Sequence, residues 1–141
     1  MVIDHDDADD ITQEVFIKIY KNIDGFREDS QLYTWIYRIA TNECLTFLQR
    51  KKRRFFLPIN DVAKELLGKL DLAVHISGEE IQLKLQKALL HLPDKQRLVF
   101  NMKYFDDMTY EEISTITKTS VGALKASYHH AVNKIQSFLT E

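Results

Sequence analysis

The chain has 141 residues and a net charge of −2, and 45% of its residues are hydrophobic and 28% charged. These values indicate one globular domain or two small ones and exclude a disordered chain. No signal peptide is present and no apolar run approaches the about 20 residues of a membrane span, so we expect a cytoplasmic protein without membrane insertion. The single cysteine, Cys44, excludes an internal disulfide and is expected to be a small buried apolar residue.

Charges are distributed unevenly along the first third of the chain. Residues 1–30 hold nine acidic and three basic side chains, whereas residues 31–54 hold one acidic and six basic ones. Such a layout favours two different partners on two faces of the protein. Scarce glycine and proline, with four and two residues, favour helices over a turn-rich sheet.

The first predicted helix covers residues 7–23. Its apolar residues recur at helical spacing and form one stripe of Ile11, Val15, Phe16, Ile19 and Ile23. Acidic residues at its start suit the positive end of the helix dipole, and Gly25 is expected to cap its end. The acidic start is therefore either a solvated helix end or a surface that docks a basic partner protein.

The second predicted helix follows Ser30 and extends to Arg54. Its buried face is expected to contain Leu32, Trp35, Ile36, Ile39, Ala40, Leu45 and Leu48. Aromatic rings near its start and cations near its end suit unpaired nucleic acid, because bases stack on rings and cations hold phosphates. A loop at the helix start, with polar groups such as Ser30 and Asn42, would hold an extruded base. The alternatives are that Trp35 is a core residue and that the cations at 50–54 only complement the helix dipole.

Residues 55–78 lack a clear period and are expected to be a linker with a partial helix. The second half of the chain is predicted to hold four helices. The first of them begins near Glu79 and is ended by Pro93. The next begins at Asp94 and turns four apolar residues inward: Leu98, Val99, Met102 and Phe105.

The last two predicted helices form a helix-turn-helix. Thr109 and Glu112 have capping-box spacing, so a helix can begin at Tyr110, and Ser120 can cap the next one. That next helix has an apolar stripe of Val121, Leu124, Tyr128, Ala131, Val132, Ile135 and Phe138. Its opposite face is small, polar or basic, as entry into the DNA major groove requires, and residues 113–140 include no acid. The alternative is an ordinary antiparallel helix pair in a small bundle.

No arrangement of residues typical of catalysis is present, since nucleophile–base pairs, phosphate-binding glycine loops and enclosed carboxylate pairs are all missing. His129 and His130 do not suit a metal ion, because adjacent residues point to different faces of a helix and no third ligand is near. We therefore expect a protein that is not an enzyme and that has no cofactor.

Along the predicted helices described above, the chain closely resembles the extracytoplasmic-function (ECF) family of bacterial sigma factors. The motifs DADDITQEVF at 7–16 and WIYRIATN at 35–42 resemble the family's σ2 domain, and YEEI at 110–113 with VGALK at 121–125 resembles its σ4 domain. The resemblance implies an all-α fold of two small helical domains on a flexible linker. These would be a partial σ2 bundle at 1–56, the linker at 57–78 and a four-helix σ4 domain at 79–141.

The resemblance also implies a transcription initiation factor that binds core RNA polymerase through its β′ clamp and β subunits. It would read the −35 promoter element as duplex and melt the −10 element, without catalysis of its own. The β′ clamp would meet Asp7, Asp10, Gln13, Glu14 and Phe16. The −10 element would contact Phe26, Ser30, Tyr33, Arg38, Asn42, Arg50, Lys51, Lys52, Arg53 and Arg54. The −35 element would contact Ser120, Lys125, Ala126, Ser127, His129, His130 and Lys134. An anti-sigma factor is a plausible further partner, because both domains would expose their binding surfaces.

Two departures from the family pattern lead to expectations. The family has one or two helices before the acidic one, where this chain has only residues 1–6, so the apolar stripe would lack cover. We therefore expect the σ2 half to be weakly stable or to self-associate. Ser127 and His130 stand where many members have arginine, so we expect weaker or pH-sensitive −35 binding.

Two other functions fit parts of the sequence. A stand-alone helix-turn-helix regulator would bind palindromic duplex as a dimer without polymerase, but it leaves residues 26–54 without a role. A truncated module that binds polymerase without initiating transcription would result if the missing helices are essential.

Overall fold

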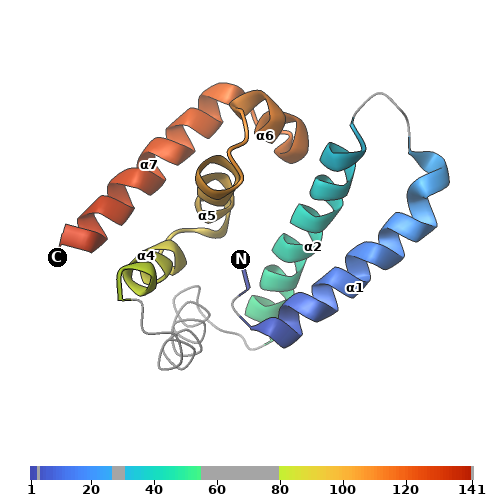
Figure 1. The fold of residues 1–141 in the computed structure, drawn as a ribbon, viewed down its shortest axis with the longest axis horizontal. Helices are drawn as coiled ribbons and strands as arrows, with labels where there is room; N and C mark the ends of the chain where they lie inside the picture. The colour runs from blue at the N-terminus through green and yellow to red at the C-terminus, as the bar shows by residue number, and fades with distance from the viewer. Residues whose placement is uncertain (3, 27–30, 55–79, 141) are drawn as a thin grey trace.

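The computed structural model describes residues 1–2, 4–26, 31–54 and 80–140, and within these ranges the side chains of 52–54 and 81 are left undescribed. All regular elements in these ranges are helical, which confirms the predicted all-α fold. In chain order they are α1 (His5–Asn22), the 3₁₀ turn η1 (Ile23–Gly25), α2 (Leu32–Arg54), α4 (Glu80–Leu90), α5 (Asp94–Phe100), the π-helical turn η2 (Asn101–Phe105), α6 (Tyr110–Thr117) and α7 (Val121–Thr140) (Figure 1). The predicted linker and its partial helix lie outside the described residues.

The first two helices pack side by side and antiparallel (Figure 1). Helix α1 begins two residues earlier than predicted, because the Asp4 carboxylate accepts a hydrogen bond from the backbone nitrogen of Asp6 at 2.8 Å and so caps the helix. The buried core between the two helices consists of Ile11, Val15 and Leu48 together with Val2. Leu48 is only 1% exposed and is the best-covered side chain of this half.

Three details of the predicted first helix are wrong. Phe16 and Ile23 are 66% and 42% exposed, because α2 covers only the line through Ile11 and Val15, and Phe16 lies about 100° around the helix from Val15. Gly25 is not a left-handed cap, since its φ lies outside the left-handed region. Helix α1 ends instead in a 3₁₀ turn, in which the backbone nitrogen of Phe26 donates to the Ile23 carbonyl at 3.1 Å.

In the second half, α4, α5 and α6 pack against α7, which joins two buried clusters. Leu124 of α7 lies in the cluster that α5, η2 and α6 build around Met102 and Ile113. Ala131 and Ile135 lie in the cluster that α4 and α5 build. The predicted apolar stripe of α7 is therefore confirmed as its inward face.

One residue of the predicted second-half core is placed wrongly. Phe105, expected to point inward, is 50% exposed. The helix that starts at Asp94 widens into a π-helical turn, in which the backbone nitrogen of Asp106 donates to the Asn101 carbonyl at 3.2 Å. A wider turn rotates the residues that follow it relative to the α-helical face, so Phe105 no longer continues the line of Leu98 and Met102.

The helix-turn-helix forms from the local signals that predicted it. The Thr109 hydroxyl accepts from the backbone nitrogen of Glu112 at 3.2 Å, and the Ser120 hydroxyl accepts from that of Ala123 at 3.3 Å. Between the two caps, Lys118 ends α6 in the left-handed conformation with φ 55°, and its nitrogen donates to the Ser114 carbonyl at 2.8 Å.

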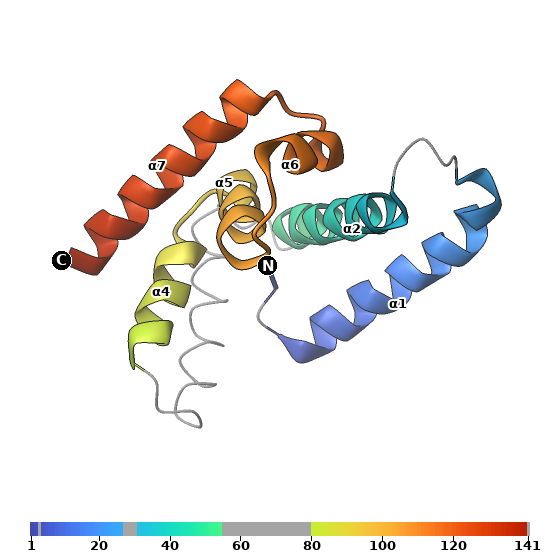
Figure 2. The same cartoon turned by 45° about the horizontal axis from the view of Figure 1, so that its top comes forward.

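The two halves are in contact, and α2 and α6 lie side by side in both ribbon views (Figures 1 and 2). Tyr37 and Leu45 of α2 pack against the buried cluster that contains Met102, Ile113 and Leu124. Helices that the sequence assigns to two different domains therefore share one surface.

Candidate nucleic-acid interface

The outward face of α7 is the first candidate surface. Leu124, Ala131 and Ile135 are buried on one side of this helix, so the opposite side faces solvent. Most of the residues predicted to contact the −35 element are exposed there or at the cap before it: Ser120, Lys125, Ala126, His129, His130 and Lys134. Ser127 is half-buried nearer the core side. The residues of this prediction thus lie together on one face, apart from Ser127.

Two lysines of this face are held by residues of other elements. Lys125 Nζ lies 5.8 Å from the centroid of the Tyr110 ring, and Lys103 Nζ lies 4.8 Å from the same centroid. Lys134 Nζ donates a hydrogen bond to Gln96 Oε1 of α5 at 3.1 Å. No spacing within one helix links Lys103 and Tyr110 to Lys125, so this grouping could not be predicted from the sequence.

Arg38, the cation within the WIYRIATN motif at 35–42, makes a hydrogen bond inside the protein. Arg38 Nη2 donates to the Thr115 carbonyl of α6 at 2.6 Å. That carbonyl belongs to the last turn of α6, where helical carbonyls lack partners from their own helix and cations are favoured. Arg38 Nε is buried without a hydrogen-bond partner among the described residues. A residue predicted to follow the −10 strand therefore holds the two halves together in this arrangement.

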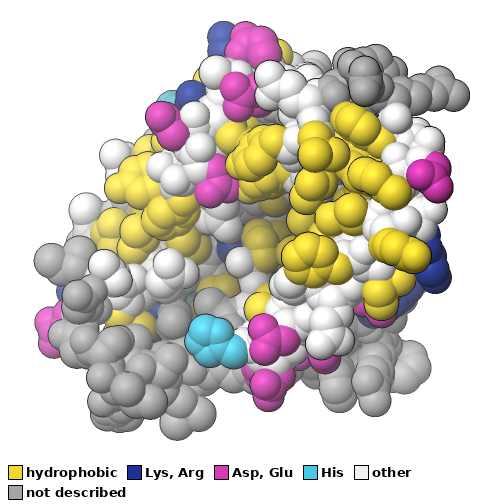
Figure 3. All heavy atoms as spheres, turned by 45° about the vertical axis from the view of Figure 1, so that its right-hand side comes forward, with side chains coloured by type: hydrophobic (Ala, Val, Ile, Leu, Met, Phe, Trp, Pro, Cys, Tyr) yellow, Lys and Arg dark blue, Asp and Glu magenta, His cyan; other side chains and the backbone are white. Residues whose placement is uncertain are grey.

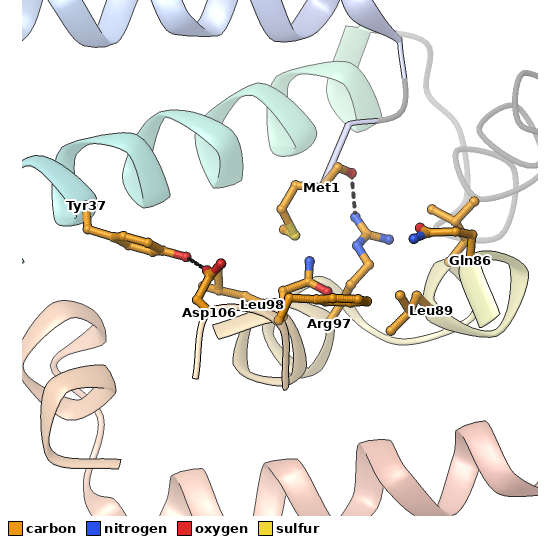
Figure 4. Close-up of a pocket in the computed structure, with 10 residues that line it drawn as sticks. Met1, Tyr37, Gln86, Leu89, Arg97, Leu98 and Asp106 are labelled. Atoms are coloured by element: carbon orange, nitrogen blue, oxygen red, sulfur yellow. Dashed lines mark hydrogen bonds between the residues drawn. The ribbon is translucent and has the colours of Figure 1, made fainter. Parts of the chain in front are cut away.

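A second contact between the halves lies beside it. The Tyr37 hydroxyl donates to Asp106 Oδ2, and burial, together with this hydrogen bond, raises the pKa of Tyr37 well above that of a free tyrosine (Figure 4). On the far side of a cavity of about 340 Å³, Arg97 Nη2 donates to the Met1 carbonyl at 3.3 Å (Figure 4). Burial lowers the pKa of Arg97. The Asp94 carboxylate partly opposes this lowering, because its Oδ1 lies 3.5 Å from Arg97 Nη2.

The predicted base pocket at the start of α2 is only partly described. Ser30 lies outside the described residues. The Phe26 and Trp35 rings pack with their centroids 5.2 Å apart, so Phe26 is partly engaged. Tyr33 is exposed, and the centroid of its ring lies 5.7 Å from that of Tyr37. Asn42 is exposed but stands ten residues after the start of α2, about 15 Å along the axis, so it does not line a pocket at the helix start.

The basic end of α2 lies against the acidic helix. Lys51 Nζ is 3.8 Å from Asp7 Oδ2, and Arg50 lines a hollow with Asp10 and Glu14. Opposite charges that the sequence placed on two separate faces therefore meet along the α1–α2 seam. Lys52, Arg53 and Arg54 continue α2, but their side chains lie outside the described residues.

The residues predicted to dock polymerase are divided between two sides of α1. Asp7, Asp10 and Glu14 follow one another at helical spacing and share a face with Gln13, and all but the half-buried Asp7 are exposed. Phe16 lies elsewhere and borders an apolar groove of about 460 Å³ between α1 and α2. The predicted docking set is therefore not a single patch.

Exposed apolar surface is extensive around this groove. Tyr20 is 84% exposed, and Figure 3 shows hydrophobic side chains gathered on one face of the molecule with acidic ones around them. Cys44 lines the groove and is half-buried rather than fully buried, and burial raises the pKa of its thiol, which disfavours the reactive thiolate. The expected weak stability or self-association of the first half stays a prediction that sizing and thermal melts can test.

In the described ranges, no helix combines the length and apolar character needed to cross a bilayer. Within those same residues, no three His, Cys, Asp or Glu side chains come together in a way that suits a metal ion.

Comparison with known proteins gives consistent matches. The model of "Sigma-70 region 2" matches residues 1–54, and that of "Sigma-70, region 4" matches residues 82–135. The chain is 32% identical over 143 residues to the ECF RNA polymerase sigma factor SigW of Bacillus subtilis, a match that covers 96% of this chain and 76% of the relative. It is 31% identical over 150 residues to the ECF RNA polymerase sigma-E factor of Escherichia coli, covering 94% and 76%.

Two solved structures share the fold. One is the sigma factor RpoE in complex with the anti-sigma factor NepR from Bartonella quintana, with a TM-score of 0.70 and 22% identity over 96% of this chain and 82% of that one. The other is CnrH in complex with the cytosolic domain of CnrY, with a TM-score of 0.66 and 22% identity over 99% and 75%.

Proposed function

The chain belongs to the ECF family of RNA polymerase sigma factors and directs transcription initiation at specific promoters, and from this premise we propose how its parts divide that task. Residues 1–56 act as the σ2 domain, which docks on core polymerase and captures the −10 element. Residues 57–78 act as a linker. Residues 79–141 act as the σ4 domain, which reads the −35 element as duplex. The protein supplies recognition only, acts in the cytoplasm and leaves catalysis to the polymerase.

The outward face of α7 carries the proposal for the −35 element. Small residues at its start allow the helix to approach the major groove closely, and Gly122 has nothing within 4 Å of a Cβ placed on it. Lys125, supported by the Tyr110 ring, lies at the edge of this face, where a cation meets the phosphate backbone. Lys103, whose Nζ also lies over the Tyr110 ring and donates to the Met108 carbonyl at 3.2 Å, is a further proposed phosphate ligand.

Capture of the −10 element requires a change in the arrangement of the two halves. The Arg38 guanidinium is directed at the Thr115 carbonyl in this arrangement, so we propose that this hydrogen bond breaks when Arg38 contacts a DNA strand. Core polymerase would supply the free energy for this separation by binding the open form more tightly than the closed one. The acidic face of α1, with Asp10 and Glu14, is the surface that we assign to the polymerase clamp.

An anti-sigma factor is a further proposed partner. Both structural neighbours are sigma factors captured with an anti-sigma protein. A protein that binds across α2 and α6 would hold Arg38 and Tyr37 in their present contacts and so keep the −10 surface engaged.

Run-off transcription with purified core polymerase tests the proposal. We expect start-site-specific RNA with the wild-type chain, and loss of −35-dependent RNA with Lys125→Ala and His130→Ala while core binding is retained. Gln136→Ala, an exposed change on the same helix, serves as the matched control. DNA binding without initiation would indicate a stand-alone regulator instead, and polymerase binding with inhibition would indicate a module that starts nothing.

A further inference from the structure

His129 and Asn133 form a pair on the outward face of α7, one helical turn apart. The Asn133 side-chain nitrogen Nδ2 lies 3.1 Å from Nε2 of the His129 ring, which is hydrogen-bond distance. Both side chains are exposed, so this bond does not satisfy a group that folding has buried. A contact of this kind adds little to stability, and its effect is to fix where the imidazole ring points.

The position of His129 along the helix makes that orientation important. Gly122, Ala126, His129 and Asn133 follow one another at steps of four, three and four residues, so they form one row on the side of α7 opposite its buried residues. The first two members of the row have minimal side chains. His129 is therefore the first residue in this row that is long enough to reach a base edge in the groove.

We propose that Asn133 is a positioning residue for promoter recognition, which fixes the His129 ring and thereby the base pair that His129 contacts. The inference rests on the proposed −35 role of α7. An imidazole whose Nε2 is held by an amide presents its Nδ1 edge, whereas a ring that rotates freely offers either nitrogen to several base edges. Asn133 thus converts a mobile side chain into a selective one for a single base pair.

Neighbouring side chains do not supply this restraint. Lys125, one turn before His129, is drawn toward the Tyr110 ring of α6. The His130 ring makes a tilted ring contact with that of His129, with the two centroids 6.1 Å apart. Within the described part of the chain, the hydrogen-bond partner of the His129 ring is Asn133.

The test uses the full chain bound to core polymerase and a DNA duplex library randomised over one helical turn. Sequences selected by the wild type are compared with those selected by Asn133→Ala, His129→Ala and the double variant, with Gln136→Ala as the exposed control on α7. We expect Asn133→Ala and His129→Ala to lose preference at the same base pair, by about three- to tenfold, as for one hydrogen bond. The double variant should lose no more than His129→Ala alone, because the two residues act as one unit.

Several outcomes separate this inference from the function on which it rests. If the wild type selects no sequence, the −35 role of α7 fails. If the wild type selects a sequence and Asn133→Ala keeps the preference that His129→Ala loses, only the positioning role is overturned. Thermal melts and binding to unselected duplex complete the test, since a purely structural residue would change the melting temperature and weaken all sequences equally.

Discussion

The nucleic-acid surfaces that we propose for the two halves differ in how far they are already engaged within the protein. The outward face of α7 is open to solvent, and its contacts to Tyr110, Gln96 and Asn133 orient side chains without covering them. The corresponding surface of α2 is engaged, because Arg38 and its neighbour Tyr37 bond to the other half. The duplex reading that we propose would therefore need no rearrangement of the described residues, whereas the proposed strand capture would need α2 and α6 to separate.

From this difference we infer that one surface of α2 would serve two purposes. The side of α2 that matches the family's strand-binding motif is also the side that closes on the helix-turn-helix. Duplex at the −35 element is then expected to bind first, and engagement of the −10 strand to follow opening. Five substitutions, grouped in four predictions, test this contrast between the halves.

The largest effect is expected from the cores. Leu124 and Leu48 are each 1% exposed, and replacing either by alanine should lower the free energy of unfolding by about 2–5 kcal/mol. Leu124 belongs to the cluster that also receives Tyr37 and Leu45, so Leu124→Ala should speed amide hydrogen exchange in α2 as well as in α6 and α7. Leu48→Ala should speed exchange in α1 and α2 alone. Unchanged exchange in α2 of the Leu124 variant would show that the halves are energetically separate.

The next effect is expected from the arginine that links the halves. Arg38→Ala removes a hydrogen bond from a charged donor, a contact of about 1.5–3 kcal/mol, so the open form should gain population. Small-angle scattering should report a larger radius of gyration. Promoter melting should nevertheless fall, because the −10 strand loses a cationic contact. Gln49→Ala is the matched control, since Gln49 is exposed on the same helix and is not among the residues predicted to contact the −10 element. A variant as compact as the wild type would remove this contact from the closing interface.

A smaller effect is expected at the tyrosine beside it. The pKa of Tyr37 is raised in the closed form, while a free tyrosine titrates at about 10. Above about pH 10 the closed form therefore binds more protons than the open or unfolded one, so its stability falls as the pH rises further. Tyr37→Phe removes this contribution, and chemical denaturation between pH 8 and about 11 should show a shallower fall than in the wild type. Parallel curves for the two proteins would speak against the Asp106 contact.

The smallest effect is expected within one half. Lys18 and Glu43 form an ion pair between α1 and α2 at the surface, with half of the lysine side chain exposed. Pairs of this kind contribute about 0–1 kcal/mol, so Lys18→Ala should leave the melting temperature nearly unchanged and become less visible still in salt. A loss comparable to that of Arg38→Ala would mean that contacts inside the first half matter as much as contacts between the halves.

Local signals in the sequence predicted the helix-turn-helix closely. Thr109 and Ser120 cap backbone groups three positions away. The apolar stripe that buries Leu124 and Ile135 likewise depends on residues a few positions apart, so both features can be predicted from the sequence. The predictions that Phe16 and Phe105 are buried were wrong for two different reasons. Phe16 lies off the line of α1 that α2 covers, and a π-helical turn rotated Phe105 outward.

The sequence by itself determined the family, the helices and the outward face of α7 that we propose for DNA, because these follow from motifs and from spacing within single helices. Only the tertiary structure decided which of those residues are available. Arg38 bonds to a carbonyl 77 positions away, Tyr37 to a carboxylate 69 positions away, and Lys51 lies against Asp7 of another helix. Such pairings depend on how helices pack, and packing between distant segments is set by surface shape and burial, which no local period records.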